Sequence, residues 1–149
     1  MRLAVAGDHS ALAHKAAVVA HLRAQGHSVD DLGPHDAASC DYPDYGLPAA
    51  RGVAAGRYDR AVLICGTGIG MSIAANKVRG VRCGLAHSVA TARLAAGHNR
   101  AQVLALGARI VDAPTAVAMV EAWLTEPFEE RHQRRLDKIA AAESEGPAC

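Results

Sequence analysis

Short apolar runs alternate along the chain with segments whose apolar residues recur every three or four positions. An uninterrupted apolar run predicts a buried strand, whereas the three-to-four spacing predicts an amphipathic helix. The predicted strands are residues 2–6, 28–32, 61–65, 81–86 and 103–106, of which 28–32 is more polar. This alternation predicts an α/β domain with an open, mostly parallel sheet of five strands and helices on both faces.

Capping residues and helix breakers delimit the helices between these strands. The first helix is expected to begin after Ser10, an N-cap residue, and to stop at Gly26. A later helix is expected to run from Asp112 to Leu124, because Asp112 followed by Pro114 is typical of an N-cap with proline in the first turn. The other predicted helices are 46–55, 69–77 and 89–96, and the Pro-, Asp- and Ser-rich residues 34–43 predict a surface loop.

A last helix is expected from about Phe128 to Ala142. Apolar residues occupy one face, and basic residues, among them Arg131 and Arg135, occupy another. Because both faces of the sheet are already covered, we expect this helix to reach a neighbouring subunit. The whole chain is expected to form one domain, 1–149, with fraying from about residue 143.

Composition excludes several classes of protein. The 149 residues (15.4 kDa) fit one domain, and half of them are hydrophobic. Sixteen basic and fifteen acidic residues leave no basic excess for nucleic acid or a membrane surface, and five aromatic residues are too few for base stacking. No apolar run reaches the roughly 18 residues of a membrane span. The apolar start is broken too early for a signal peptide, so we expect a cytoplasmic protein.

The stretch with the clearest chemical content is Cys65-Gly66-Thr67-Gly68-Ile69-Gly70, where a buried strand leads through three glycines into a helix. Glycines allow a sharp turn and close approach of a ligand, and a helix N-terminus offers N–H groups to an anion. The dinucleotide-binding fingerprint is excluded because Met71 stands where its third glycine would be, and the P-loop pattern is also absent.

Cys65 has two interpretations at this position. A thiol beside a helix N-terminus can serve as a base or nucleophile in its thiolate form, whereas a buried cysteine can also be a small hydrophobic residue. The other three cysteines lack such surroundings, and the four together show neither CxxC pairs nor zinc-site spacing.

Further polar residues follow strands or helices. Asp8 and His9 follow the first strand. They fit two interpretations equally well: an acid/base pair, or a helix-capping aspartate next to a solvated histidine. His98 and Asn99 lie at a helix-to-strand connection, another place where polar groups can converge. Arg109 follows the fifth strand.

Arg131 and Arg135 are four residues apart on the last predicted helix, so that both guanidinium groups can leave one face and bind one oxyanion. The competing interpretation of this run is a solvated basic face.

Taken in order, these motifs resemble one known family. Gly7-Asp8-His9, Cys65–Gly70, Ala74–Lys77, His98-Asn99, Gly107–Arg109 and Arg131–Arg135 closely resemble the ribose-5-phosphate isomerase B family, which includes galactose- and allose-phosphate isomerases. The resemblance extends from Arg2 to about Ile139. It implies a Rossmann-like, three-layer sheet, no metal or other cofactor, and homodimers or homotetramers whose active sites combine two subunits.

The family implies roles for individual residues. Cys65 would be the base that moves a proton between C1 and C2, and His98, with Asp8 assisting, would open the furanose ring. The amides of Gly66, Thr67, Gly68, Ile69 and Gly70 would hold the enediolate, with the Thr67 hydroxyl near the reacting oxygens. Asn99 would bind sugar hydroxyls.

The resemblance also implies a phosphate site formed by His9, Arg109, Arg131 and Arg135, the last two from the partner subunit. Another branch of the family has a glutamate base where this chain has Met71, which places the chain in the cysteine branch. His87 lies where the family varies.

The expected activity is therefore the interconversion of ribose 5-phosphate and ribulose 5-phosphate through an enediolate. Two alternatives remain: a related tetrose- or hexose-phosphate isomerase, and a flavodoxin-like nucleotide-binding module without catalysis. The second is disfavoured because no aromatic residue lies in the glycine loop.

Overall fold

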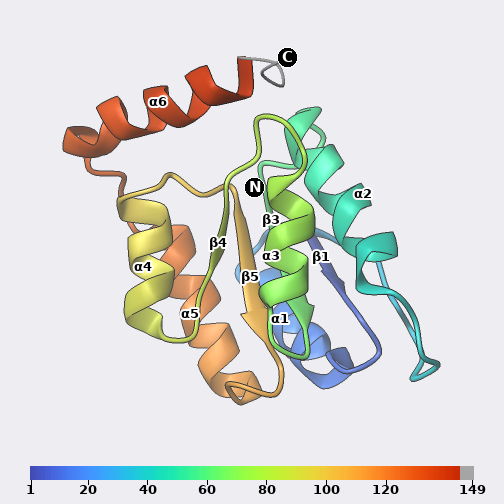
Figure 1. Cartoon of the computed structure of the whole chain (residues 1–149). Coiled ribbons are helices and arrows are strands. Elements are labelled where there is room, and N and C mark those ends of the chain that lie inside the picture. Colours follow the sequence, from blue (N-terminus) through green and yellow to red (C-terminus); the bar gives the residue numbers. More distant parts are fainter. Residues whose placement is uncertain (145–149) are drawn as a thin grey trace.

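The structure, a computed structural model, describes residues 1–144, and the strands within them form one sheet (Figure 1). These strands are β1 (Arg2–Gly7), β2 (Ser28–Asp31), β3 (Arg60–Cys65), β4 (Cys83–Leu85) and β5 (Val103–Gly107). All neighbours pair in parallel, in the order β2-β1-β3-β5-β4. The predicted five-stranded parallel sheet is confirmed, and the carboxyl ends of its strands lie along one edge.

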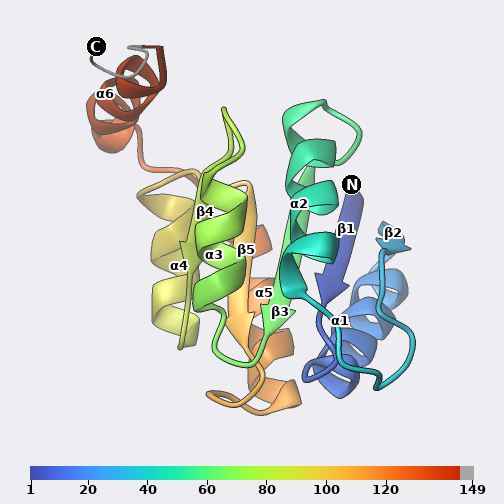
Figure 2. The ribbon, with the colours of Figure 1, turned by 45° about the vertical axis from the view of Figure 1, so that its right-hand side comes forward.

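Helices within residues 1–144 cover both faces of the sheet, as predicted (Figure 2). One layer consists of α1 (Leu12–Ala24), α4 (Val89–Gly97) and α5 (Ala113–Thr125). The opposite layer consists of α2 (Tyr42–Ala54) and α3 (Ile69–Asn76). The fold is therefore the expected three-layer, Rossmann-like α/β arrangement.

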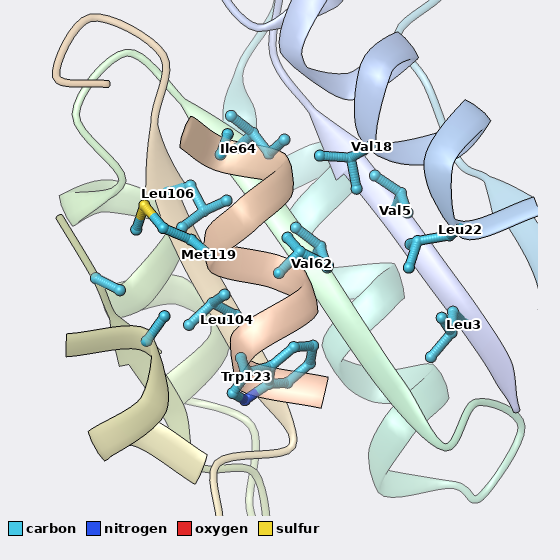
Figure 3. Close-up of a cluster of buried hydrophobic side chains, with 14 of the residues drawn as sticks. Leu3, Val5, Val18, Leu22, Val62, Ile64, Leu104, Leu106, Met119 and Trp123 are labelled. Atoms are coloured by element: carbon cyan, nitrogen blue, oxygen red, sulfur yellow. The ribbon is translucent and has the colours of Figure 1, made fainter. Parts of the chain in front are cut away.

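Large apolar side chains fill the space between the sheet and helices α1 and α5 (Figure 3). Side chains two residues apart on a strand point to the same face, which is why alternate strand residues enter this layer. The layer contains Leu3, Val5, Val18, Leu22, Val62, Ile64, Leu104, Leu106, Met119 and Trp123. At about 1.5–3 kcal/mol for each large side chain removed from water, this cluster is a main source of stability.

The other face of the same strands carries smaller side chains. Ala4, Ala6, Ala61 and Ala105 point to this side and allow α2 and α3 to pack close to the sheet. Cys65 belongs to this set, since it follows Leu63 at a spacing of two. The alternation along β3 therefore directs the thiol toward α3 and away from the large apolar cluster.

The last two elements, η1 (Glu130–His132) and α6 (Gln133–Ser144), lie apart from both layers, at the end of the sheet where the strands begin (Figures 1 and 2). Leu136 is the buried residue of α6, and Ile139 is 47% exposed. A groove of about 620 Å³ lies between α6 and the region around β4. The contact of α6 with a partner subunit stays a prediction.

Some boundaries differ from the predicted ones. Ser10 does not cap α1: the N-cap position is Ala11, without a side-chain bond, and the Ser10 hydroxyl donates to Asp8 instead. Helix α2 begins at Tyr42, four residues earlier than expected, because Pro43 fits a first helical turn. Strand β4 covers three residues where six were predicted.

Other boundaries are confirmed. Gly26 ends the α1 region with a φ of 80°, and the Asp112 side chain accepts the Thr115 N–H at 2.8 Å, as an N-cap does. Residues 143 and 144 still belong to α6, and the rest of the tail expected to fray lies outside the described residues. Among residues 1–144, none of the helices has both the length and the hydropathy that a membrane span requires.

Candidate active site

Cys65 ends β3 at the carboxyl edge of the sheet, where its side chain is 4% exposed. The backbone N–H of Gly68 donates to Cys65 Sγ over 3.2 Å. Gly68 itself has a φ of +78°, and a Cβ there would lie 2.7 Å from Leu85 and 2.8 Å from the Leu106 carbonyl carbon. Only glycine fits this turn, which places an amide donor on the sulfur.

The glycine loop continues directly into the first turn of α3. The Thr67 hydroxyl accepts the Ile69 N–H at 3.3 Å, and the first-turn amides of a helix lack partners further along the helix. The Tyr42 ring lies against Gly70, since a Cβ at Gly70 would be 2.5 Å from it. The sequence pattern did not single out Tyr42, because its contact with the loop bridges 28 residues.

Asp8 and His9 lie beside this loop, because β1 pairs with β3. The Asp8 N–H donates to the Ile64 carbonyl at 3.1 Å. Asp8 is 8% exposed, and its Oδ1 accepts the Ser10 N–H at 2.9 Å and the Ser10 hydroxyl at 2.5 Å. His9 Nδ1 accepts the Cys40 N–H at 3.3 Å. A neutral His9 therefore carries its proton on Nε2, which can donate to a bound anion.

Arg109 joins the same edge from the end of β5. Its N–H donates to the Gly66 carbonyl at 2.9 Å, and its guanidinium lies 3.3 Å from where a Gly66 Cβ would be. Any larger residue at position 66 would press against Arg109. Arg109 is exposed, and among residues 1–144 it has no carboxylate partner, so it is available to an anion. His87, at the same edge after β4, is also exposed.

The second group of expected site residues lies at the opposite end of the sheet. Helix α4 runs antiparallel to the strands, so His98 and Asn99 come near the start of β5 while Cys65 pairs with Gly107 at its end. Four strand steps separate these levels, about 13 Å at ~3.3 Å per residue. His98 and Asn99 therefore do not meet the carboxyl-end residues within one chain, because a connection into a strand lies at its amino end.

Arg131 and Arg135 lie beside His98, also at this amino end. Arg131 belongs to the 3₁₀ turn η1, not to the continuous helix that was predicted, and Arg135 lies in α6. Arg131 Nε donates to Glu129 Oε2 at 2.6 Å, and Arg135 NH1 donates to His132 Nδ1 at 2.7 Å. The two guanidinium groups are thus held by neighbouring members of one cluster.

Glu129 and His132 complete this amino-end cluster, which we define as His98, Glu129, Arg131, His132 and Arg135. His98 Nε2 lies 3.2 Å from Glu129 Oε1, and the His98 and His132 rings stack with centroids 4.1 Å apart. The hydrogen bond from Arg131 lowers the pKa of Glu129 below its usual value. Burial, reinforced by His98 and the two guanidinium groups, lowers the pKa of His132. Glu129 therefore stays ionised and His132 neutral near pH 7.

The same three side chains His98, Glu129 and His132 are also of metal-ligating types, with ligand atoms within 4.8 Å of one another. The two rings stack at an interplanar angle of 21°, so their in-plane lone pairs run side by side and do not converge on one ion. Arg131 already donates a hydrogen bond to the Glu129 carboxylate, and Arg135 donates one to His132 Nδ1. This arrangement favours an ion-pair network over a metal site.

Sequence comparison relates the chain to sugar-phosphate isomerases over nearly its whole length. The family model described as Ribose/Galactose Isomerase matches residues 3–139. Ribose-5-phosphate isomerase B of Escherichia coli is 41% identical over 143 residues, covering 95% of this chain and 96% of that protein. Ribose-5-phosphate isomerase B of Mycobacterium tuberculosis is 40% identical over 147 residues, covering 96% and 90%.

Solved structures give the same relationship. A ribose-5-phosphate isomerase B of Clostridium thermocellum has a TM-score of 0.94 and 41% identity, covering 97% of this chain and 98% of that one. The Mycoplasma genitalium ribose-5-phosphate isomerase B, solved with bound ribulose-5-phosphate, has a TM-score of 0.92 and 41% identity, covering 97% of each chain.

Proposed function

The chain belongs to the ribose/galactose isomerase family, and we propose that it interconverts ribose 5-phosphate and ribulose 5-phosphate through an enediolate, with Cys65 as the base. The observation that carries this proposal is the position of the Cys65 sulfur. It lies at the end of β3, 3.2 Å from an amide nitrogen and beside the N-terminus of α3. A base next to oriented N–H donors is what proton transfer beside a carbonyl requires.

This geometry supports the following proton transfer. The Cys65 thiolate takes the proton from C2 of the open-chain aldose; C1 and C2 become doubly bonded and the carbonyl electron pair moves onto O1. Amides of residues 66–70 and the Thr67 hydroxyl stabilise this oxyanion. Cys65 then returns the proton to C1, while the O2 proton passes to O1 and leaves a carbonyl at C2. Before this step, His98 opens the furanose ring with the assistance of Asp8.

The substrate's phosphate would be held by hydrogen-bond donors from both ends of the sheet. His9 and Arg109 lie at the carboxyl edge, whereas Arg131 and Arg135 lie in the amino-end cluster with His98. Asn99 directly follows His98 in the sequence. Since these groups are separated by the sheet, a complete site needs a second copy of the chain. A two-fold axis perpendicular to the strands would place the carboxyl edge of one subunit against the amino-end cluster of the other and form two sites.

Exposed apolar side chains support this dimer. Ile69 and Ile73 on α3 are 51% and 57% exposed, and Ile139 on α6 is 47% exposed. Ile69 adjoins the glycine loop, and Ile139 lines the groove under α6. One apolar surface therefore lies next to the carboxyl edge and the other next to the amino-end cluster, the two half-sites of the proposed dimer. Burying them in a shared interface would bring the half-sites together.

A substrate panel tests the function. We expect kcat/KM to be highest for ribose 5-phosphate among the phosphates of ribose, erythrose, allose and galactose. Free ribose should be far poorer, because binding energy from the phosphate positions a flexible open-chain sugar. A preference for the four- or six-carbon sugar phosphate would instead identify the chain as one of the related tetrose- or hexose-phosphate isomerases. Equal turnover of free ribose would overturn the assignment of a phosphorylated substrate.

A further inference from the structure

We propose that Glu129 is a positioning residue for His98, which it orients and whose positive charge it balances while the furanose ring opens. This inference rests on the proposed function, because it concerns the ring-opening step assigned there to His98.

The position of Glu129 is set by the backbone. Its N–H donates to the Gly97 carbonyl at 2.8 Å, and its own carbonyl accepts the His132 N–H at 3.0 Å. These two bonds hold the residue between the end of α4 and the start of η1. The carboxylate therefore reaches His98, 31 residues away in sequence, from a fixed point and not from the tip of a free loop.

The carboxylate in turn determines which nitrogen of His98 faces the substrate. An ionised carboxylate only accepts hydrogen bonds, so the His98 Nε2 atom, 3.2 Å from Glu129 Oε1, carries the proton of the neutral ring. Nδ1 is then the nitrogen with a free lone pair. The His98 side chain is 31% exposed, which leaves this nitrogen accessible to a bound sugar.

His132 supports the arrangement from the other side. Arg135 can only donate, so His132 Nδ1 accepts its hydrogen bond and Nε2 carries the proton. Within residues 1–144 this buried Nε2 atom has no hydrogen-bond partner, and it lies 3.9 Å from Glu129 Oε2. The neutral His132 ring stacks on His98 and limits its rotation.

The charged groups that face His98 decide which charge the site can accept. Arg131 and Arg135 are cationic, whereas Glu129 is the carboxylate in contact with the ring. On the α4 side, Glu126 lies near Gly97 but is held by Arg93 at 2.6 Å. The C-terminus of α4, where His98 is the C-cap, also favours a cation. Without Glu129, a protonated His98 would face two guanidinium groups.

Ring opening requires two proton transfers through His98. His98 Nδ1 takes the proton from the anomeric hydroxyl, and C1=O1 forms as the C1–O4 bond breaks. The electron pair of that bond leaves on O4, which receives the proton back from His98. The imidazolium exists only between these two transfers, and the Glu129 carboxylate stabilises it there, as a buried carboxylate does for the histidine of a catalytic triad.

Ring opening and enolisation can be measured separately in the same protein. Ribulose 5-phosphate has its O5 esterified and cannot close to a furanose, so exchange of its C1 hydrogen with D₂O needs Cys65 but no ring opening. We expect Glu129→Gln to lower kcat for ribose 5-phosphate by about 10- to 100-fold. KM and the deuterium exchange rate of ribulose 5-phosphate should stay within about threefold. His98→Asn should give the same split.

Two further variants make the test decisive. Glu129→Asp keeps the charge and should recover part of the rate lost in Glu129→Gln; it also carries the test if the glutamine variant does not fold. Glu130→Gln removes the neighbouring carboxylate, which pairs with Arg100 and not with His98, and should leave both reactions unchanged.

Equal loss of both reactions in Glu129→Gln, or no loss in either, would overturn the role of Glu129. Absence of isomerisation and exchange in the unmodified protein would instead overturn the proposed function. A His98→Asn variant that isomerises ribose 5-phosphate normally would remove His98, and Glu129 with it, from ring opening.

Discussion

The carboxyl edge of the sheet and the amino-end cluster both carry expected site residues but are built differently. At the carboxyl edge, Asp8 and Cys65 are buried at strand ends, and backbone hydrogen bonds tie their loops together. In the amino-end cluster, Glu129, Arg131 and Arg135 are exposed; an ion pair joins Glu129 to Arg131, and a side-chain hydrogen bond joins Arg135 to His132. The comparison supports the proposal that one chain preorganises the base, whereas the proposed phosphate and ring-opening groups at the amino end act on a substrate held by a second copy.

The largest expected effect concerns the base. Cys65→Ala should lower kcat by about 10²- to 10⁴-fold, the range for a general base, while the melting temperature and phosphate binding change little. Steady-state kinetics and thermal unfolding measure this. Cys40→Ser is the control: it keeps the backbone N–H that bonds His9, so activity should stay near that of the unmodified protein. A Cys65→Ala variant with more than about a tenth of the original kcat would refute the assignment.

The second prediction addresses the separation of the two half-sites directly. Cys65→Ala subunits and Arg135→Ala subunits, each of low activity, should regain activity when mixed and allowed to exchange. Equal mixing makes half of the dimers mixed, and one of two sites in each is intact, so about a quarter of the original activity should return. Recovery should follow the fraction of mixed dimers measured by native mass spectrometry. No recovery despite exchange would place both residues in one subunit's site.

The third prediction concerns the stability of the carboxyl edge. Lys15 donates to both oxygens of Asp31 at 2.5 Å, and their side chains are 5% and 21% exposed. Asp31→Asn would leave the buried Lys15 charge unpaired and should lower the free energy of unfolding by about 3 kcal/mol. The matched change in the other region, Glu130→Gln, breaks an exposed pair with Arg100 and should cost under about 1 kcal/mol. Urea unfolding measures both losses in the free energy of unfolding, and similar losses for the two variants would contradict this difference between the buried and the exposed pair.

The same pair predicts a pH dependence. Burial raises the pKa of Asp31, but the hydrogen bond from Lys15 and its charge outweigh burial, so the folded-state pKa lies below the ordinary 3.8. A lowered folded pKa gives stability that is fully present above the unfolded pKa and is lost as pH falls through the folded value. The stability gap between the unmodified protein and Asp31→Asn should therefore be constant near neutrality and shrink below about pH 4. A stability gap that widens in acid would contradict a lowered folded-state pKa of Asp31.

The last prediction concerns a single phosphate contact at the amino end. Arg135→Ala should raise KM strongly and lower kcat moderately, because one charge-assisted contact is worth roughly 1.5–3 kcal/mol and part of it positions the sugar. Arg135→Lys should recover part of the loss, since lysine keeps the charge but not the paired donors. With free ribose as substrate, Arg135→Ala should have little effect. An equal loss with free ribose would place Arg135 outside phosphate binding.

Local pattern was sufficient for most of the fold and for one half of the site. Buried strands such as 61–65 are uninterrupted apolar runs, and Asp112 with Pro114 marks a helix start that depends only on its own turn. The glycine loop after Cys65 was likewise visible, since a tight turn with φ of +78° at Gly68 needs glycine wherever it occurs. The predicted N-cap role of Ser10 was wrong, because its hydroxyl donates to a competing partner, Asp8, two residues away.

The sequence by itself determined the elements, the parallel sheet and the groups at the carboxyl edge, because these depend on side-chain period, turn chemistry and the rule that strand ends meet along one edge. Only the tertiary structure decided that Glu129 and His132 surround His98. Those contacts join residues about 30 positions apart through the packing of α4 against the segment before α6. No local pattern encodes a distance that arises when two separate elements pack together.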